Sequence, residues 1–218
     1  MSIYIGPDEV SAVYIGGTLA SAVYVGDVKI WPTGAPPVES WDFVDDFERT
    51  SIGTTDWTGS GALIAGTAPY RYLRKNSSAG SADYWTTRQF ASDDLEAEGL
   101  IGPIMDLQQV AAIIFGSSSR YVALEFSKSV TKAFAYNGSS WPLLRDFGAI
   151  PWAEGDLIRL KRSGSTFTLY RNGTSLGTFT SSEGMGPTHR RVGLNVRMAL
   201  NVISWYGPTW DKISMRAN

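Results

Sequence analysis

The feature that most constrains the fold is a run of alternating apolar and polar residues between positions 157 and 180. In its first part, the apolar side chains of Ile158 and Leu160 alternate with basic residues. A period of two is typical of a strand with one buried and one solvated face. Two turn sequences interrupt the run, Ser163-Gly164 and Asn172-Gly173, and Asn-Gly is a strong hairpin signal. The segment therefore predicts a three-stranded antiparallel meander.

This pattern resembles the central meander of laminin-G-like or concanavalin A-like jelly-roll domains. Two further segments, Asp45-Asp46-Phe47-Glu48-Arg49 and Trp210-Asp211-Lys212-Ile213-Ser214-Met215, are similar to the first and last strands of that family. The similarity is strongest to versions found in bacterial and bacteriophage surface proteins. It covers residues 41–218 and implies an all-β, two-sheet jelly-roll sandwich. Many short strands, spaced about ten residues apart and separated by turn sequences, agree with this fold, and we expect the first and last strands to pair.

A ten-residue repeat occupies the N-terminal part of the chain, as Ile3-Tyr4-Ile5-Gly6, Val13-Tyr14-Ile15-Gly16 and Val23-Tyr24-Val25-Gly26. We expect each copy to form a short strand ended by glycine, giving a small three-stranded module over residues 1–31. Isolated domains of fewer than about 40 residues usually need metals, disulfides or partners. Because the sequence has no cysteine, we expect this module to dock on a larger host assembly or on copies of itself, through Tyr4, Tyr14, Tyr24 and Trp31.

The segment 32–40 is rich in proline and is typical of an extended linker. We therefore expect it to separate the repeat module from a second domain over residues 41–218. The alternative is that the repeat strands pack on that larger domain. The repeats, which end in Lys29-Ile30-Trp31-Pro32, also resemble N-terminal segments of minor tail proteins and other virion proteins of tailed bacteriophages. This resemblance implies an attachment module.

Composition excludes several classes of function. The formal net charge of −2 argues against nucleic acid binding, which needs a basic surplus to displace counterions from phosphate. A chain without cysteine forms no disulfide and no thiolate metal site, and the single His189 excludes a multi-histidine site. No segment has the pattern of a signal peptide or a membrane span. We therefore expect a protein that is made in the host cytoplasm, carried in the virion and not inserted into a membrane.

Alternating acids provide an enzymatic alternative. Asp94, Glu96 and Glu98 would share one face of a strand, and one family of jelly-roll glucanases carries Glu-x-Asp-x-Glu on such a strand for glycoside hydrolysis. In this sequence the first two residue types are exchanged, and the bulky residues that would line a sugar cleft on that face are absent. We favour a solvated strand face and expect no catalytic residue and no enzymatic activity.

The sequence also contains candidate residues for two other kinds of site, a catalytic histidine and a calcium site. His189 lies between two expected strands without a nucleophile elbow anywhere in the chain, so it receives no catalytic role. Several jelly-roll lectins and laminin-G-like domains use calcium, and Asp45, Asp46 or Asp211 would offer oxygen ligands. No spaced Asp-x-Asp-x-Asp-Gly loop is present. We expect no metal and no other cofactor, with calcium kept as an alternative.

Aromatic residues in loop sequences indicate a sugar-binding surface. Trp141 lies in the segment 136–142, and Trp205 and Tyr206 lie in the segment 204–208. Indole and phenol rings offer flat apolar faces that stack on the C–H face of a sugar. Polar side chains that should point away from the core complete a predicted shallow groove, on strands that we expect to be neighbours in one sheet: Arg159, Lys161, Tyr170, Asn195 and Arg197. The alternative is that a loop tryptophan simply covers one end of the sandwich.

Three functional hypotheses follow from the sequence. The leading one is a bacteriophage virion protein of the minor tail or baseplate type, with an outward-facing jelly roll that binds a host-surface glycan and gains avidity from several copies. The second is a capsid-decorating or fibre protein that binds no sugar. The third is a glycoside hydrolase that degrades polysaccharide with Glu96 or Glu98.

Overall fold

The computed structural model describes residues 40–218 except positions 69, 76–79, 104–109, 128, 201–203 and 207, together with four short strands between residues 14 and 31. For those four strands, and for residues 63, 70, 198–200 and 204–206, only the backbone is described. The chain forms two compact units, Met1–Ser40 and Trp41–Asn218. The predicted linker over residues 32–40 lies outside the described residues apart from Ser40.

The described part of the first unit forms two hairpins. β1 (Tyr14–Ile15) pairs with β2 (Thr18–Leu19), and β3 (Val23–Val25) pairs with β4 (Val28–Trp31), both antiparallel. This corrects the expectation of one strand per repeat, because the second and third repeats each pair with the residues that follow them. The intervening pairs, Gly16-Gly17 and Gly26-Asp27, are both typical of two-residue hairpin loops. The first repeat, with Tyr4, lies outside the described residues, as do the side chains of the other docking candidates, Tyr14, Tyr24 and Trp31.

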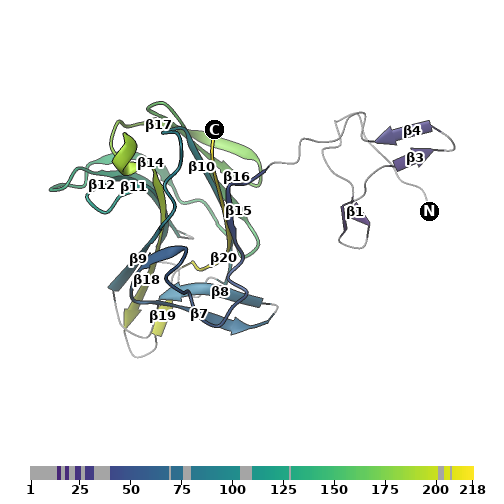
Figure 1. Ribbon diagram of the computed structural model, residues 1–218, viewed down its shortest axis with the longest axis horizontal. Helices are drawn as coiled ribbons and strands as arrows, with labels where there is room; N and C mark the ends of the chain where they lie inside the picture. The colour runs from purple at the N-terminus through teal and green to yellow at the C-terminus, as the bar shows by residue number, and fades with distance from the viewer. Residues whose placement is uncertain are drawn as a thin grey trace. The chain divides into compact units, whose positions relative to one another are not determined.

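The second unit is a sandwich of two antiparallel sheets, as the sequence predicts (Figure 1). Sheet I contains, in spatial order, β17 (Thr174–Thr180), β16 (Thr166–Arg171), β15 (Leu157–Ser163), β10 (Leu95–Ile101), β20 (Trp210–Ala217), β8 (Tyr70–Lys75) and β7 (Ala62–Thr67), and β5 (Phe43–Asp45) pairs with β20. Sheet II contains β14 (Leu143–Gly148), β13 (Thr131–Tyr136), β12 (Arg120–Phe126), β11 (Ala111–Ser117), β18 (Arg191–Leu200), β9 (Gly80–Thr86) and β6 (Trp57–Gly59), and β19 (Ser204–Tyr206) pairs with β18. A short 3₁₀ turn, η1 (Pro187–His189), precedes β18.

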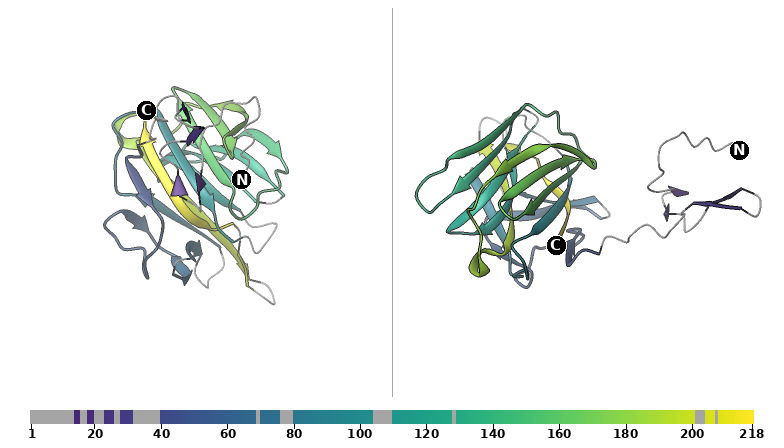
Figure 2. Two further views of the ribbon diagram at one scale, coloured as in Figure 1. Left: turned by 90° about the vertical axis from the view of Figure 1, so that its right-hand side faces the viewer. Right: turned by 90° about the horizontal axis from the view of Figure 1, so that it is seen from above.

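The predicted meander is confirmed as β15, β16 and β17. Ser163 pairs with Thr166, and Arg171 pairs with Thr174, so each connection is a two-residue loop. Asn172 and Gly173 have φ values of 49° and 81°, the positive values that a type I′ turn requires at both central positions. The predicted pairing of the terminal strands is also confirmed, because β5 lies antiparallel to β20. The left view of Figure 2 faces sheet I, with the C-terminal strand in yellow.

The core lies between the sheets and is built from the inward-facing residue of each alternating pair. Three tryptophans, Trp57, Trp152 and Trp210, are among its largest fully buried side chains. Their indole N–H groups donate to Asp45 Oδ2 at 2.7 Å, to Thr131 Oγ1 at 2.9 Å and to the Asn195 carbonyl at 3.4 Å, respectively. Each buried donor is therefore satisfied, as a dry interior requires.

Trp210 occupies the centre of this core. Its ring packs on Gly99, where a Cβ atom would lie 2.2 Å from Cζ3 of the indole. It also makes an edge-to-face contact with Phe126, with ring centroids 5.3 Å apart. Glycine at position 99 is thus required by the close approach of the indole to β10. Through its hydrogen bond to the Asn195 carbonyl, Trp210 also joins sheet I to the central strand β18 of sheet II.

Candidate functional site

The outer face of sheet II carries the candidate site. Inward side chains such as Val122 and Leu124 belong to the core, so the alternate residues of β12 point outward. The strand register places side chains from four strands in rows across this face. One row is Glu125, Ala112, Asn195 and Asp83, and the next is Ala123, Ile114, Gly193 and Trp85. The centre of the face therefore carries small or aliphatic residues, and larger side chains surround it.

One side of this centre is an aromatic ridge, which we define as Trp85, Tyr121, Tyr136 and Trp141. Tyr121 lies in the middle, with ring centroids 5.6 Å from Trp85 and 5.1 Å from both Tyr136 and Trp141. Trp85 and Tyr121 are buried, whereas Trp141 is 49% exposed. A half-exposed indole that rests on buried rings offers a rigid flat face to solvent.

Trp85 can lie against the sheet because its cross-strand partner is Gly193. A Cβ atom at Gly193 would be 3.0 Å from the indole ring, closer than ordinary van der Waals contact. The glycine opposite the tryptophan thus sets the height of the ridge above the sheet.

The opposite side of the centre is a polar quartet, which we define as Asp83, Glu125, Asn195 and Arg197. Asn195 Nδ2 donates to Asp83 Oδ1 at 2.5 Å, and Arg197 Nη2 donates to Glu125 Oε1 at 2.8 Å. Two buried polar atoms of the quartet have no hydrogen-bond partner, the acceptor Oδ1 of Asn195 and the donor Nε of Arg197. Because unpaired buried polar atoms are costly, this pair points to a ligand that both donates and accepts hydrogen bonds.

Ridge and quartet enclose a pocket. The central part has a volume of about 90 Å³ and is lined by Ser81, Asp83, Ala112, Ile114, Tyr121, Ala123, Glu125, Trp141, Asn195 and Arg197. An adjoining hollow of about 220 Å³ is lined by Glu125, Phe134, Trp141 and Arg197. The two hollows share three residues, so they form one depression beside the exposed indole of Trp141.

The Tyr121 hydroxyl stays protonated in this setting. Burial raises its pKa well above the ordinary value, and the negative charge of Asp83 raises it further. No hydrogen bond joins this hydroxyl to another described residue. It therefore adds a neutral donor and acceptor to the pocket.

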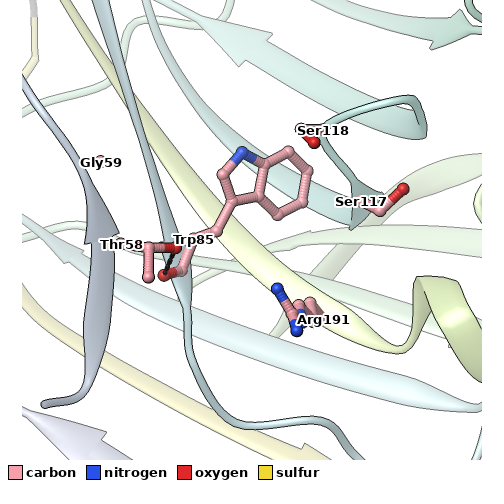
Figure 3. A pocket seen from close by; sticks show the side chains of 6 residues that line it. All are labelled: Thr58, Gly59, Trp85, Ser117, Ser118 and Arg191. Atoms are coloured by element: carbon pink, nitrogen blue, oxygen red, sulfur yellow. Dashed lines mark hydrogen bonds between the residues drawn. The ribbon is translucent and has the colours of Figure 1, made fainter.

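A third hollow lies on the other side of Trp85, and we call it the Arg191 pocket (Figure 3). It has a volume of about 240 Å³ and is lined by Thr58, Gly59, Trp85, Ser117, Ser118 and Arg191. Figure 3 shows the Trp85 indole with Ser117 and Ser118 on one side and Arg191 of β18 on another. Trp85 thus belongs to both the ridge and this pocket.

The structure brings together only part of the groove that the sequence predicts. Trp141, Asn195 and Arg197 all line the central pocket. Arg159, Lys161 and Tyr170 do not, because β15 and β16 belong to sheet I whereas β18 belongs to sheet II. The expectation that these strands are neighbours in one sheet is therefore wrong. Trp205 and Tyr206 lie on β19 beside β18, and their side chains are outside the described part of the chain.

Five residues of the ridge and the quartet were not identified as candidates from the sequence: Asp83, Trp85, Tyr121, Glu125 and Tyr136. The alternation of Tyr121, Ala123 and Glu125 on one strand shows that they share a face, but not which face is solvated. Trp85 is buried, as the size of its side chain favours, but it lies on the outer face of sheet II in a second apolar cluster with Tyr121.

Glu96 and Glu98 lie on sheet I, away from this pocket. Glu96 is 1% exposed and pairs with Arg159 at 3.0 Å and with Arg216 at 2.8 Å, and Glu98 pairs with Arg159 at 2.7 Å. Both guanidinium groups lie over the Trp41 ring. The acids that the sequence offered for hydrolysis thus form an ion-pair network on the outer face of sheet I, and the expectation of a solvated strand face is wrong for Glu96, which is buried.

The calcium candidates have other contacts. Both oxygens of Asp45 accept hydrogen bonds from nitrogen donors, Arg49, Trp57 and the Phe47 amide. Burial raises the pKa of Asp211, and the charges of Glu48, Glu154 and Asp46 raise it further. Among the described residues, no group of three or more acidic or histidine side chains is arranged to hold a metal ion.

Two further observations concern the remaining candidates. His189 lies at the end of η1, with Nδ1 2.7 Å from Ser117 Oγ. The described residues include no helix that is long and apolar enough to span a membrane.

Comparisons with known proteins support the fold. No protein-family model and no curated protein sequence matches the chain. A protein of unknown function with a galectin-like fold from Bacillus subtilis is similar in structure, with a TM-score of 0.60 and 10% identity over 81% of this chain and 96% of that one. The carbohydrate-binding module CBM66 from Bacillus subtilis has a TM-score of 0.53 and 16% identity over 76% of this chain and 94% of that one. A β-1,3-1,4-glucanase from a mouse hindgut metagenome has a TM-score of 0.56 and 11% identity over 81% and 99%, respectively. At these identities the likeness shows the jelly-roll fold.

Proposed function

We propose that the jelly roll binds a glycan between the aromatic ridge and the polar quartet of sheet II. The main support is that an exposed indole, Trp141, borders a pocket with one buried acceptor and one buried donor, neither of which has a hydrogen-bond partner among the described residues. A sugar presents an apolar C–H face for the indole and hydroxyl groups that both donate and accept. Asp83 and Glu125 hold Asn195 and Arg197 in place before a ligand arrives, which reduces the entropy lost on binding.

The proposal is binding without bond cleavage. The central strand beneath the pocket contributes Ala112 and Ile114, which offer no proton and no nucleophile. The two carboxylates of the pocket, Asp83 and Glu125, each accept a hydrogen bond from a neighbouring side chain. One similar structure is a carbohydrate-binding module, and another is a glucanase, so the fold occurs in both kinds of protein. The side chains on the face determine whether a protein of this fold binds or cleaves a sugar.

The first prediction concerns two residues of the pocket. Trp141→Ala and Asn195→Ala should each weaken binding to a glycan identified on an array at least tenfold, about 1.4 kcal/mol, because one removes the stacking surface and the other the free acceptor. Lys161→Ala and Tyr170→Ala, on sheet I, are the matched controls and should leave affinity unchanged. Titration calorimetry with the identified oligosaccharide measures the difference.

Two results would contradict the proposal. One is the absence of any binding on an array that covers bacterial cell-wall and capsular glycans. The other is equal affinity of the pocket variants and the sheet I controls, provided that circular dichroism shows them folded. Either result would favour the alternative of a capsid-decorating or fibre protein that binds no sugar.

We further propose that residues 1–31 attach the jelly roll to a larger assembly, as in a bacteriophage tail or baseplate, so that the protein acts in the virion. In support, the described strands of this unit form two hairpins of two to four residues per strand, and isolated hairpins are at best marginally stable in water. The repeats also resemble those of minor tail proteins.

The second prediction tests this attachment. In solution, the full chain should form an oligomer or bind isolated virion components, whereas a chain without residues 1–31 should do neither. Analytical ultracentrifugation and co-sedimentation with particles measure the two properties. A full chain that stays monomeric and binds no virion component would contradict the attachment role and leave the glycan proposal intact.

A further inference from the structure

The Arg191 pocket has a chemistry different from that of the central pocket. Arg191 begins β18 and pairs across the sheet with Gly116, which has no side chain to cover it. Within the described part of the chain, the Arg191 guanidinium makes no hydrogen bond or ion pair. No acidic side chain lines the pocket. A cation without a carboxylate partner thus faces a hollow of about 240 Å³.

The other polar groups of this pocket are also suited to an anion. The Trp85 indole N–H donates to no described residue, and an indole is a donor that cannot accept. Ser118 adds an exposed hydroxyl. Ser117 Oγ is already engaged with His189 Nδ1 at 2.7 Å and with Ser119 Oγ at 3.0 Å, so it helps to fix the turn between β11 and β12. Donors therefore prevail over acceptors around the hollow.

Ridge and pocket meet at Trp85, which contacts Tyr121 on the ridge side and lines the Arg191 pocket on the other. A glycan that stacks on the exposed indole of Trp141 and extends past the edge of Trp85 would thus present a further sugar to Arg191. A planar guanidinium matches a carboxylate through two parallel hydrogen bonds and does so better than an ammonium group.

We propose that the Arg191 pocket binds the carboxylate of an acidic sugar, a uronic acid, in the glycan held on sheet II. This inference deepens the proposed function and rests on it for the neighbouring sugars, but the pocket's own preference for a carboxylate is separable. Arg191 pairs with the carboxylate, the Trp85 indole N–H and the Ser118 hydroxyl donate to the acid sugar, and the indole edge borders its ring.

The test uses the full chain and two sugars that differ only at C6, sodium D-glucuronate and D-glucose. The indole N–H signal of Trp85, assigned by its loss in Trp85→Phe, is followed by nuclear magnetic resonance during titration. We expect glucuronate to shift this signal with at least tenfold higher affinity than glucose. The affinity should fall as NaCl is raised, because salt screens the charge pair. Equal shifts with both sugars, or none with glucuronate, would overturn the proposal.

Variants locate the effect. Arg191→Gln keeps much of the side-chain length and removes the charge, so it should weaken glucuronate binding at least tenfold and leave glucose unaffected. Arg190→Gln is the adjacent control, because Arg190 is already paired with Asp93 at 3.2 Å; glucuronate affinity should be unchanged. An Arg191→Gln protein with unaltered glucuronate affinity would also overturn the proposal. The salt dependence and the comparison of the two sugars need only the wild-type chain, so they decide the matter even if a variant does not fold.

Failure here is distinguishable from failure of the proposed function. If Trp141→Ala abolishes glycan binding but Arg191→Gln and the glucuronate titration show no effect, the central pocket binds sugar and the Arg191 pocket does not bind carboxylate. If glucuronate binds at Arg191 but no array glycan depends on Trp141, the anion site stands and the ridge proposal fails.

Discussion

Replacing Trp210 with alanine should lower the free energy of unfolding of the jelly roll by about 3–5 kcal/mol. The indole is fully buried, packs on Gly99 and Phe126, and hydrogen-bonds the Asn195 carbonyl. Its removal leaves a cavity between the two sheets, and the sandwich can close only part of that space. Because domains of this size are stable by about 5–15 kcal/mol, the loss is a large share of the total.

The matched control is Trp141→Ala, the same substitution at a half-exposed ring. We expect it to cost about 1 kcal/mol or less, since it removes contacts with Tyr121 and Tyr136 but opens no cavity. Urea denaturation monitored by circular dichroism measures both values. Similar costs for the two variants would show that the core does not depend on the contact between Trp210 and Gly99.

The second large effect is expected at Asp45. We call Asp45 and the three residues that donate hydrogen bonds to it, Arg49, Trp57 and Phe47, the carboxylate clamp. The Asp45 oxygens accept from two Arg49 nitrogens at 2.6 Å, from Trp57 Nε1 at 2.7 Å and from the Phe47 amide at 2.8 Å. Asp45→Ala should cost about 3–5 kcal/mol, because it leaves buried donors without partners. The substitution also removes the hydrogen bond that holds the amide of Phe47, a buried residue with a φ of 54°. This left-handed conformation costs an L-residue about 1–2 kcal/mol.

The clamp should also make stability depend on pH. Burial raises the pKa of Asp45, but hydrogen bonds from Arg49, Trp57 and the Phe47 amide outweigh this effect, so the net pKa lies below its ordinary value. The stabilisation is therefore complete above the unfolded value of about 3.9 and is lost as the pH falls through the folded value.

Denaturation between pH 3 and pH 7 checks both the stability loss of Asp45→Ala and its dependence on pH. The difference in unfolding free energy between wild type and Asp45→Ala should be constant from about pH 5 to 7 and should shrink below about pH 4. Asp46→Ala is the control: Asp46 is exposed, and among the described residues its carboxylate accepts a hydrogen bond from the Glu48 amide alone. A difference that persists unchanged at pH 3 would mean that Asp45 acts through its shape and not its charge.

Local chemistry explains which parts of the fold were predictable. The meander over β15, β16 and β17 follows from alternation and from Asn172-Gly173, whose conformational preference acts within the turn itself. The similarity of the terminal strands to one family likewise predicted their pairing. In the N-terminal unit, the repeats were visible, but the strands that follow them were not, because Thr18–Leu19 is too short to show a period.

The site was less predictable because it is assembled by long-range pairing. Alternation showed that Asn195 and Arg197 point away from the core, but not that Asp83 and Glu125 lie beside them on β9 and β12. Nor does it distinguish the outer face of one sheet from that of the other, which is why Arg159 and Tyr170 were grouped with them. The size of Trp85 favours burial but does not show which face of the sheet it covers, and its position on the outer face depends on the absence of a side chain at Gly193.

The short first strand of the jelly roll has a mechanical consequence. A pull on the N-terminal end of this unit acts first on Trp41 and Asp42, which contact Arg159, Arg216 and Ala217 of sheet I. It acts next on β5, whose register with β20 comprises three residue pairs. The carboxylate clamp lies at the end of β5 and ties this strand to Arg49 and Trp57, so we expect it to resist further separation once the three pairs of β5 have opened. Asp45 is therefore the residue at which we expect separation of the first strand to stop.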